Sequence, residues 1–159
     1  MNPYAMFLSN RDPREVVQET PARLTAYVER LGAYGIERSP APEKWNVRQI
    51  LCHLADCEIV FAFRLRQALA EPNHVIQPFD QDAWAKSYAS TSLDAHRALE
   101  AFSAARRWNI ALLDTILPEQ LSKPLSHPER GAMTFQTLIE TMGGHDLNHI
   151  AQIERIALA

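Results

Sequence analysis

The chain has 159 residues, of which 47% are hydrophobic and 22% are charged, and its formal net charge is −3. This length suits one domain, and the apolar content lets a chain of this size bury roughly 68–70% of its unfolded surface, which excludes a disordered protein. The sequence has no cluster of Lys and Arg, so neither nucleic acid nor a membrane is expected as a partner. We therefore treat residues 1–159 as a single domain.

The sequence shows no targeting or membrane-spanning segment. It does not open with a basic stretch followed by an apolar core, and no window approaches ~18 uninterrupted apolar residues. The two cysteines, Cys52 and Cys57, are five residues apart and cannot form a CxxC redox pair. We expect a cytoplasmic protein without disulfides.

The first expected helix follows Asp12. Asp12 is its N-cap, Pro13 takes the first helical position and Glu15 completes a capping box. Pro21 predicts a kink within this helix, and Gly32 is a suitable stop.

The second expected helix begins after Asn46, which forms a capping box with Gln49. Trp45 and Ile50 occupy the two positions of a hydrophobic staple, and the helix should continue to about Ala70. Its inward stripe consists of Val47, Ile50, His53, Leu54, Cys57 and Phe61.

Residues 71–90 break the helical periodicity and form a long crossover, in which residues 80–87 could be a short helix. Thr91 with Asp94 caps a third long helix, which should end before Pro118. Its inward stripe consists of Leu99, Phe102, Arg106, Ile110, Leu113 and Leu117.

A second irregular stretch, residues 118–133, precedes a fourth helix that Thr134 caps. Its core face keeps the three-and-four spacing for six turns and consists of Phe135, Leu138, Met142, His145, His149, Ile153 and Ile156. No segment alternates with a period of two, so the predicted class is all-α. Four helices of ~20–25 residues imply a four-helix bundle.

Three of the six histidines lie on inward stripes. His145 and His149 are four residues apart on one helix face, so both imidazoles can converge on one ion. His53 lies on the inward stripe of the second helix. Three neutral imidazoles in an apolar bundle form a three-ligand site with an open coordination position, which is typical of catalytic zinc.

The heights of these histidines along their helices predict the topology. His53 lies seven residues past Asn46, and His149 lies about nine residues before the end of the fourth helix. They reach the same height, within ~3 Å, only if the second and fourth helices are antiparallel, because a parallel pair would miss by ~12 Å. The metal hypothesis therefore predicts an up-down-down-up bundle with the long crossover between helices two and three.

A simpler interpretation competes with the metal site, because a histidine on an apolar helix face is more often a hydrogen-bonded core residue. The third histidine at matching height favours the metal, since three partly buried imidazoles without a shared ion would each need a polar partner. Side chains that could orient the rings through hydrogen bonds are Asp146, Asp56, Glu58 and Gln152.

Aromatic and acidic residues near the crossover could complete a pocket. Trp45, Phe79 and Trp84 could wall it, and Asp80 or Asp82 could supply a base. The competing roles are ordinary ones, a staple for Trp45 and helix caps for the two aspartates.

Two arginines fall near inward stripes. Arg64 and Arg106 could bind an anionic substrate, but structural ion pairing is the favoured role for both. Cys52 and Cys57 could be metal ligands, although a small buried cysteine is the commoner state.

Three segments together resemble one known family: EKWNVRQILCHLADCEIVFAFRLRQAL, FDQDAW and MTFQTLIETMGGHDLNHIAQIERI. They are similar to the DinB/YfiT-like superfamily of metal-dependent enzymes. The resemblance implies that His53, His145 and His149 ligate a divalent ion, that the bundle is up-down-down-up, and that homodimers are frequent. Relatives include thiol-dependent S-transferases and isomerases that use bacillithiol or mycothiol, and YfiT-type members are described as metal-dependent hydrolases.

The leading functional hypothesis is therefore a three-histidine centre that holds a divalent metal ion, with zinc or nickel favoured. The ion would activate a water or a low-molecular-weight thiol, for hydrolysis or thiol transfer on a small-molecule substrate. The alternatives are a non-catalytic bundle that binds a small ligand or partner and keeps a structural metal, and a packing module without metal.

Overall fold

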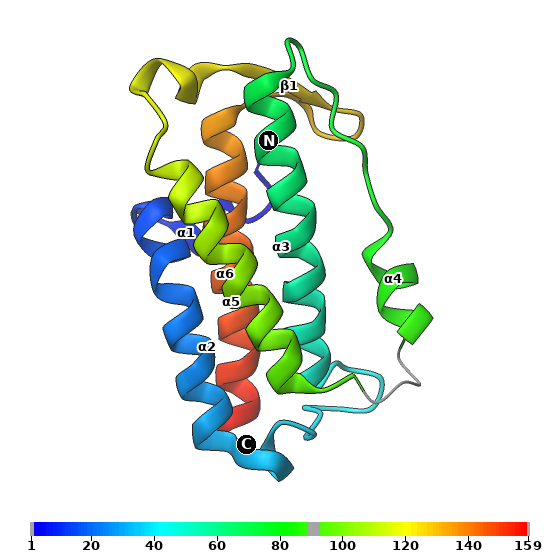
Figure 1. The fold of residues 1–159 in the computed structure, drawn as a ribbon. Helices are drawn as coiled ribbons and strands as arrows, with labels where there is room; N and C mark the ends of the chain where they lie inside the picture. Colours follow the sequence, from blue (N-terminus) through cyan, green and yellow to red (C-terminus); the bar gives the residue numbers. More distant parts are fainter. Residues whose placement is uncertain (1, 89–92, 159) are drawn as a thin grey trace.

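The computed structural model describes residues 2–88 and 93–158 as a helical bundle with one short hairpin (Figure 1). Four long helices form the bundle: α2 (Pro13–Gly35), α3 (Val47–Ala70), α5 (Ala95–Leu113) and α6 (Phe135–Leu158). The short elements are α1 (Ala5–Leu8), α4 (Gln81–Tyr88), η1 (Pro118–Ser122), β1 (Pro124–His127) and β2 (Gly131–Thr134). In Figure 1, α2 and α6 run downward while α3 and α5 run upward. The predicted up-down-down-up topology is therefore confirmed.

The start of α2 follows the sequence signals in part. The Asp12 carboxylate accepts a hydrogen bond from the Arg14 N–H at 2.8 Å, but Glu15 makes no return bond in the described chain. The backbone dihedrals stay helical at Pro21, and the interruption comes at Gly32, whose φ of 60° is left-handed. Glycine adopts this conformation without steric cost, so the break lies there and not at the proline.

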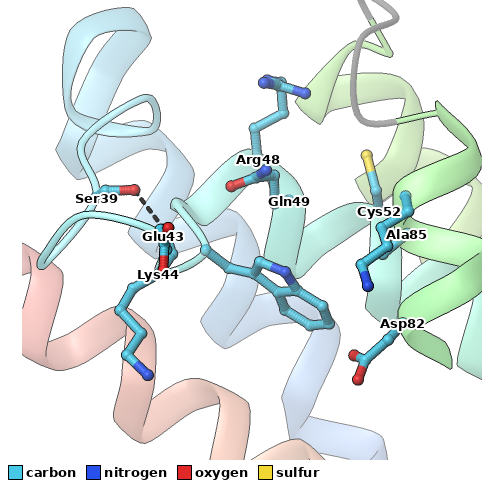
Figure 2. A pocket seen from close by; sticks show the side chains of 10 residues that line it. Ser39, Glu43, Lys44, Arg48, Gln49, Cys52, Asp82 and Ala85 are labelled. Carbon is cyan, nitrogen blue, oxygen red and sulfur yellow. Dashed lines mark hydrogen bonds between the residues drawn. The ribbon is translucent and has the colours of Figure 1, made fainter.

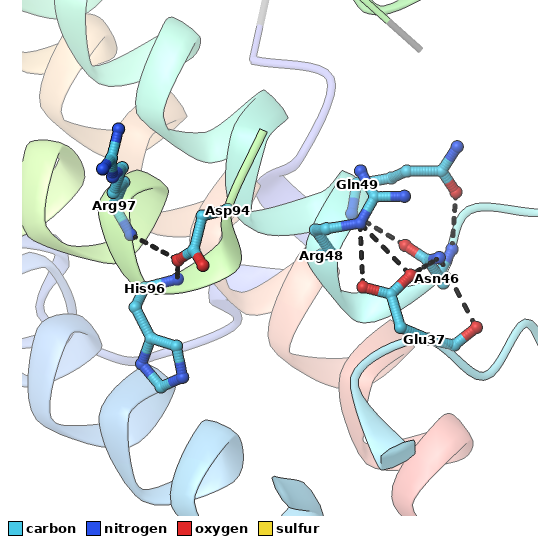
Figure 3. Close-up of polar contacts among 7 residues, drawn as sticks. All are labelled: Glu37, Asn46, Arg48, Gln49, Asp94, His96 and Arg97. Carbon is cyan, nitrogen blue, oxygen red and sulfur yellow. Dashed lines mark hydrogen bonds and ion pairs between the residues drawn. The ribbon is translucent and has the colours of Figure 1, made fainter. Parts of the chain in front are cut away.

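The start of α3 is fixed by a full capping box. The Asn46 side chain accepts from the Gln49 N–H, and the Gln49 side chain accepts from the Asn46 N–H, both at 2.9 Å (Figure 3). Glu37 ties this cap to the end of α2, because its carboxylate accepts from the Asn46 amide and pairs with Arg48. The cap fixes the height of every later residue on α3.

The predicted start of α5 is confirmed for Asp94. Its carboxylate accepts from the N–H groups of His96 and Arg97 (Figure 3). Thr91, the other predicted capping residue, lies outside the described residues.

The predicted inward stripe of α5 is wrong at its end. The helix stops at Leu113, and Leu117 lies beyond it with 55% of its surface exposed. Asn109 is fully buried instead.

A short antiparallel hairpin, which the sequence did not predict, crosses one end of the bundle. Its register pairs are Pro124↔Thr134, Leu125↔Met133, Ser126↔Ala132 and His127↔Gly131. The crossover is bonded to β1, since the Ser126 N–H donates to the His74 carbonyl and the Ile76 N–H donates to the Ser126 carbonyl. Strands of four residues are too short to show a period of two.

The core consists of two apolar clusters separated by a polar layer. The first cluster includes Leu24, Val28, Ile50, Leu54, Phe102, Ile150 and Ile153, and Trp45 packs against it as the staple predicts. The second cluster includes Val17, Cys57, Phe61, Leu65, Leu113, Leu138 and Met142. The residues between these clusters include buried Arg106 on α5 and buried His145, Asp146 and His149 on α6, and buried His53 and Glu58 lie on α3 within three residues of the point where one cluster gives way to the other. No helix in the described part of the chain is long and apolar enough to cross a membrane.

Candidate metal centre

The three histidines that the sequence singled out meet in the polar layer. His53 Nε2 on α3 lies 3.1 Å from His145 Nε2 on α6, and His149 Nε2 lies 3.2 Å from the same atom. All three side chains are buried, with 2%, 4% and 6% of their surfaces exposed. The antiparallel course of α3 and α6 brings them to one height, as the spacing predicted.

These distances match the edge of a tetrahedral metal site. Zinc–nitrogen bonds of ~2.0–2.1 Å place neighbouring ligand nitrogens about 3.3–3.4 Å apart. Hydrogen bonds among the rings cannot satisfy all three Nε2 atoms at once. Each imidazole nitrogen carries either one proton or one lone pair. His145 Nε2 can therefore bond to His53 or to His149 but not to both, whereas a shared cation would satisfy all three lone pairs.

The rings are held in their neutral form. Burial, with a smaller contribution from His149, lowers the pKa of His53 to about 3. Burial also lowers the pKa of His145 well below its usual value, and the charges of His149 and His53 act in the same direction. For His149, burial lowers the pKa although the hydrogen bond with Gln152 opposes it. Neutral imidazoles have a free lone pair, as metal ligation requires.

Gln152 orients one of the rings. Its Oε1 lies 3.0 Å from His149 Nδ1, and an amide oxygen can only accept, so Nδ1 carries the proton and Nε2 has the lone pair. Trp45 stacks beside the same ring, with its centroid 6.5 Å from His149 and 4.9 Å from His53. The sequence analysis named Gln152 as a possible orienting partner of the rings, and Trp45 as a possible pocket wall with a staple as its competing role.

Cys57 is the alternative third ligand. Its Sγ lies 3.5 Å from His53 Nε2, and one ligand atom each from His53, Cys57 and His145 lies within 4.8 Å of the others. Burial, followed by the charge of Asp56, raises the pKa of the Cys57 thiol. His149 does not belong to this group, although its lone pair, unlike that of a thiolate, is available without loss of a proton.

A second polar cluster beside the histidines is a buried ion network. Arg106 donates to both carboxylate oxygens of Asp146 and to Glu58, and Asn109 donates to the remaining Glu58 oxygen. Burial alone would lower the pKa of Arg106, but the charges of Asp146 and Glu58 outweigh it and raise that pKa. The favoured structural role of Arg106 is confirmed, and the hydrogen bonds given for Asp146 and Glu58 in the described chain go to Arg106 and Asn109 and not to the rings.

The N-terminal helix α1 covers the centre, a contact that the sequence analysis missed. Tyr4 lies edge-on to His145, with ring centroids 5.2 Å apart. A Cβ on Gly144 would lie 2.6 Å from the Tyr4 carbonyl oxygen, so only glycine allows this approach. The Gly143–Gly144 pair in the middle of a helix was the available signal.

Trp45 also lines two cavities. One of ≈ 450 Å³ is lined by Trp45, Cys52 and Asp82, among others (Figure 2), and one of ≈ 660 Å³ shares Trp45 and Asp82. None of the three histidines lines either cavity. Cys52 is buried and, like His149, does not belong to the group of possible ligand atoms in the described chain.

The other residues that the sequence analysis proposed for the pocket have other contacts in the structure. Asp80 caps α4 by accepting from the N–H groups of Asp82 and Ala83. Phe79 and Trp84 pack against each other with centroids 4.9 Å apart. Of the three proposed wall aromatics, only Trp45 has a ring contact with a metal-centre histidine in the described chain.

Comparison with known proteins gives one family and consistent relatives. The family model described as the DinB superfamily matches residues 17–153. A protein of Oceanobacillus iheyensis named "Putative metal-dependent hydrolase" is 29% identical over 137 residues, which cover 86% of this chain and 79% of the relative. "Putative metal-dependent hydrolase YfiT" of Bacillus subtilis is 28% identical over 145 residues, covering 90% and 81%.

The structural comparison agrees. A solved structure of Bacillus subtilis YfiT superposes with a TM-score of 0.84 at 26% identity, covering 92% of this chain and 84% of that one. Its title describes "a probable metal-dependent hydrolase with an unusual four-helix bundle topology". The shared topology is the one described above.

Proposed function

The chain belongs to the DinB superfamily, and we propose that it is a metal-dependent hydrolase whose divalent cation is held by His53, His145 and His149. Zinc and nickel are the favoured ions, because imidazole suits both. The single observation that carries this proposal is that the buried Nε2 atoms of His53 and His149 lie 3.1 and 3.2 Å from His145 Nε2. The names of the relatives support hydrolysis as the reaction.

Three protein nitrogens are the ligand number of a catalytic centre. A structural zinc site is closed by four protein ligands, whereas a catalytic site keeps one position for water or substrate. A cation there would supply Lewis acidity, which lowers the pKa of a coordinated water or thiol toward neutrality. Three neutral ligands leave the full positive charge of the ion for this effect.

The chain's own residues prepare the centre. Burial keeps the imidazoles neutral, and Gln152 fixes the proton of His149 on Nδ1. Trp45 and Tyr4 pack against the rings from two sides and limit the access of water. One approach to the centre in the described part of the chain is a small cavity that His145 lines.

The test is the metal content of the purified chain, measured by elemental mass spectrometry without a histidine tag. We expect about one divalent ion per chain, lost in His149→Ala and kept in His96→Ala, whose histidine is exposed on α5. Hydrolysis of model esters and amides is then measured with and without a low-molecular-weight thiol, before and after chelation. An activity that needs the thiol would favour thiol transfer over hydrolysis, and a wild type that takes up no zinc or nickel would contradict the proposal.

A further inference from the structure

A small cavity of ≈ 50 Å³ opens directly onto the histidine centre. Cys57 and His145 line it together with two cations, Arg64 from α3 and Arg130 from the turn before β2, and no Asp or Glu belongs to its lining. At about 10–15 Å³ per water-sized group, it has room for roughly three to five heavy atoms. Both charge and size suit a carboxylate.

Arg64 is not ion-paired, contrary to the sequence expectation. In the described chain its Nη2 donates to the Gln77 carbonyl at 3.0 Å, its guanidinium lies 5.6 Å from the centroid of Phe79, and its buried Nε has no hydrogen-bond partner. An unsatisfied buried donor on a charged group is costly. No carboxylate pairs with the Arg64 guanidinium in the described chain, so its positive charge has no counter-charge there.

Arg130 adds a second positive charge to the same cavity. Burial, followed by the charge of Arg130, lowers the pKa of Arg64, so the two guanidiniums repel each other across a partly desolvated space. The charge of Arg130 also reaches His145 and Tyr4. An anion between the two arginines would relieve this repulsion.

The cavity continues into an apolar groove. A second cavity of ≈ 340 Å³ shares Val60, Arg64 and Phe79 with it and is otherwise lined mainly by apolar side chains. Ile59 and Phe63, which line this groove, are 57% and 58% exposed. Arg64 therefore lies at the junction between a cationic cavity and an apolar one.

We propose that this pair of cavities binds a small organic anion, with its carboxylate between Arg64 and Arg130 and its apolar part in the groove beside Phe79. The inference rests on the proposed function, for which it names the substrate class: aromatic or aliphatic carboxylates presented to the centre at His145. Arg64 and Arg130 are binding residues in this scheme.

The test is calorimetric titration of the full chain with benzoate, with benzamide as a neutral analogue and acetate as an analogue without an apolar part. The titrations use zinc-loaded and chelated protein. Arg64→Gln and Arg130→Gln each should weaken benzoate binding roughly tenfold or more, as expected for a lost charge-assisted hydrogen bond. Arg107→Gln, which removes an exposed arginine on α5, should leave binding unchanged.

The outcomes separate this inference from the proposed function. Benzoate binding that exceeds both benzamide and acetate binding and depends on the two arginines, with zinc content unchanged in the variants, supports the inference. Benzoate binding that needs zinc but ignores both arginines would assign the carboxylate to the metal and overturn it. Normal zinc content without any benzoate binding would also overturn it, while leaving the hydrolase proposal intact.

Discussion

Two buried polar clusters lie close to each other in the bundle. They differ in whether their own side chains supply the hydrogen-bond partners and counter-charges that buried polar groups require. In the network of Arg106, Asp146 and Glu58, every carboxylate oxygen accepts a hydrogen bond and opposite charges face each other. In the histidine cluster, like groups face each other, and His145 Nε2 has two nitrogen neighbours at 3.1 and 3.2 Å but one bonding position.

This difference separates a structural cluster from a functional one. A buried polar group usually finds its partner within the protein, and in the arginine network all four carboxylate oxygens do so, although Arg106 Nε has no hydrogen-bond partner in the described chain. The histidine cluster has an unmet requirement that one divalent cation would fill. Removal of a residue from the arginine network should therefore lower the free energy of unfolding of the chain. Removal of a histidine from the histidine cluster should instead abolish ion binding.

The largest effect is expected in the arginine network. Arg106→Leu leaves Asp146 and Glu58 buried without their counter-charge, which should cost about 3–5 kcal/mol of unfolding free energy. Arg107→Leu, at the next and exposed position, should stay within about 0.5 kcal/mol of wild type. Urea denaturation of both variants is the measurement, and a loss below about 1 kcal/mol for Arg106→Leu would contradict the structural role of the network.

Zinc binding at the histidine cluster should raise the free energy of unfolding. Truncation of one of its histidines should change that free energy only weakly when no zinc is bound. At a free zinc concentration a thousandfold above its dissociation constant, wild type should gain about 4 kcal/mol of unfolding free energy. His149→Ala should lose this gain while changing far less than Arg106→Leu in chelator. Urea denaturation with and without zinc measures both, and equal stabilisation of the variant by zinc would remove His149 from the centre.

A smaller effect is expected at Gln152, which contacts His149 but not the ion. Gln152→Leu removes the acceptor that fixes the His149 proton on Nδ1. Loss of such an orienting partner should weaken zinc affinity about 10–100-fold. Competition with a chromogenic chelator measures the affinity, and an unchanged value would mean that the ring orients itself by packing alone.

The smallest effect is the pH dependence of the chelated protein. The pKa of His53 is about 3 in the folded chain and ~6.5 when unfolded, so between these values only the unfolded chain binds the proton. Stability is therefore fully present above pH ~6.5 and falls as the pH decreases, by up to about 1.4 kcal/mol per pH unit. Denaturation between pH 7.5 and 5 should show a steeper fall in wild type than in His53→Asn, and parallel curves would argue against a neutral buried His53.

Local signals in the sequence predicted the site residues that lie on regular helices. The Asn46 capping box sets the height of His53, and the stripe on α6 sets His145 and His149. Because helical geometry is periodic, these two signals, combined with the hypothesis that the histidines share one ion, predicted the antiparallel pairing.

The missed residues lie in segments without periodicity. Tyr4 reaches His145 only because Gly144 allows α1 to approach, and Arg130 is placed by a hairpin too short to leave a pattern. The ion pair expected for Arg64 is absent from the described chain, where its guanidinium lies near the Phe79 ring of the crossover instead. Such contacts follow from tertiary packing, which one sequence does not encode in a local pattern.

The central claim is that three imidazoles hold one divalent ion, with Cys57 outside its ligand set. The most direct test is zinc-edge X-ray absorption of the zinc-loaded chain, because zinc–nitrogen bonds of ~2.0–2.1 Å are resolved from zinc–sulfur bonds of ~2.3 Å. We predict about one zinc per chain with only nitrogen and oxygen neighbours, including three imidazoles, and the same spectrum from Cys57→Ala. A sulfur neighbour that disappears in Cys57→Ala, or a chain that binds no zinc, would contradict the account.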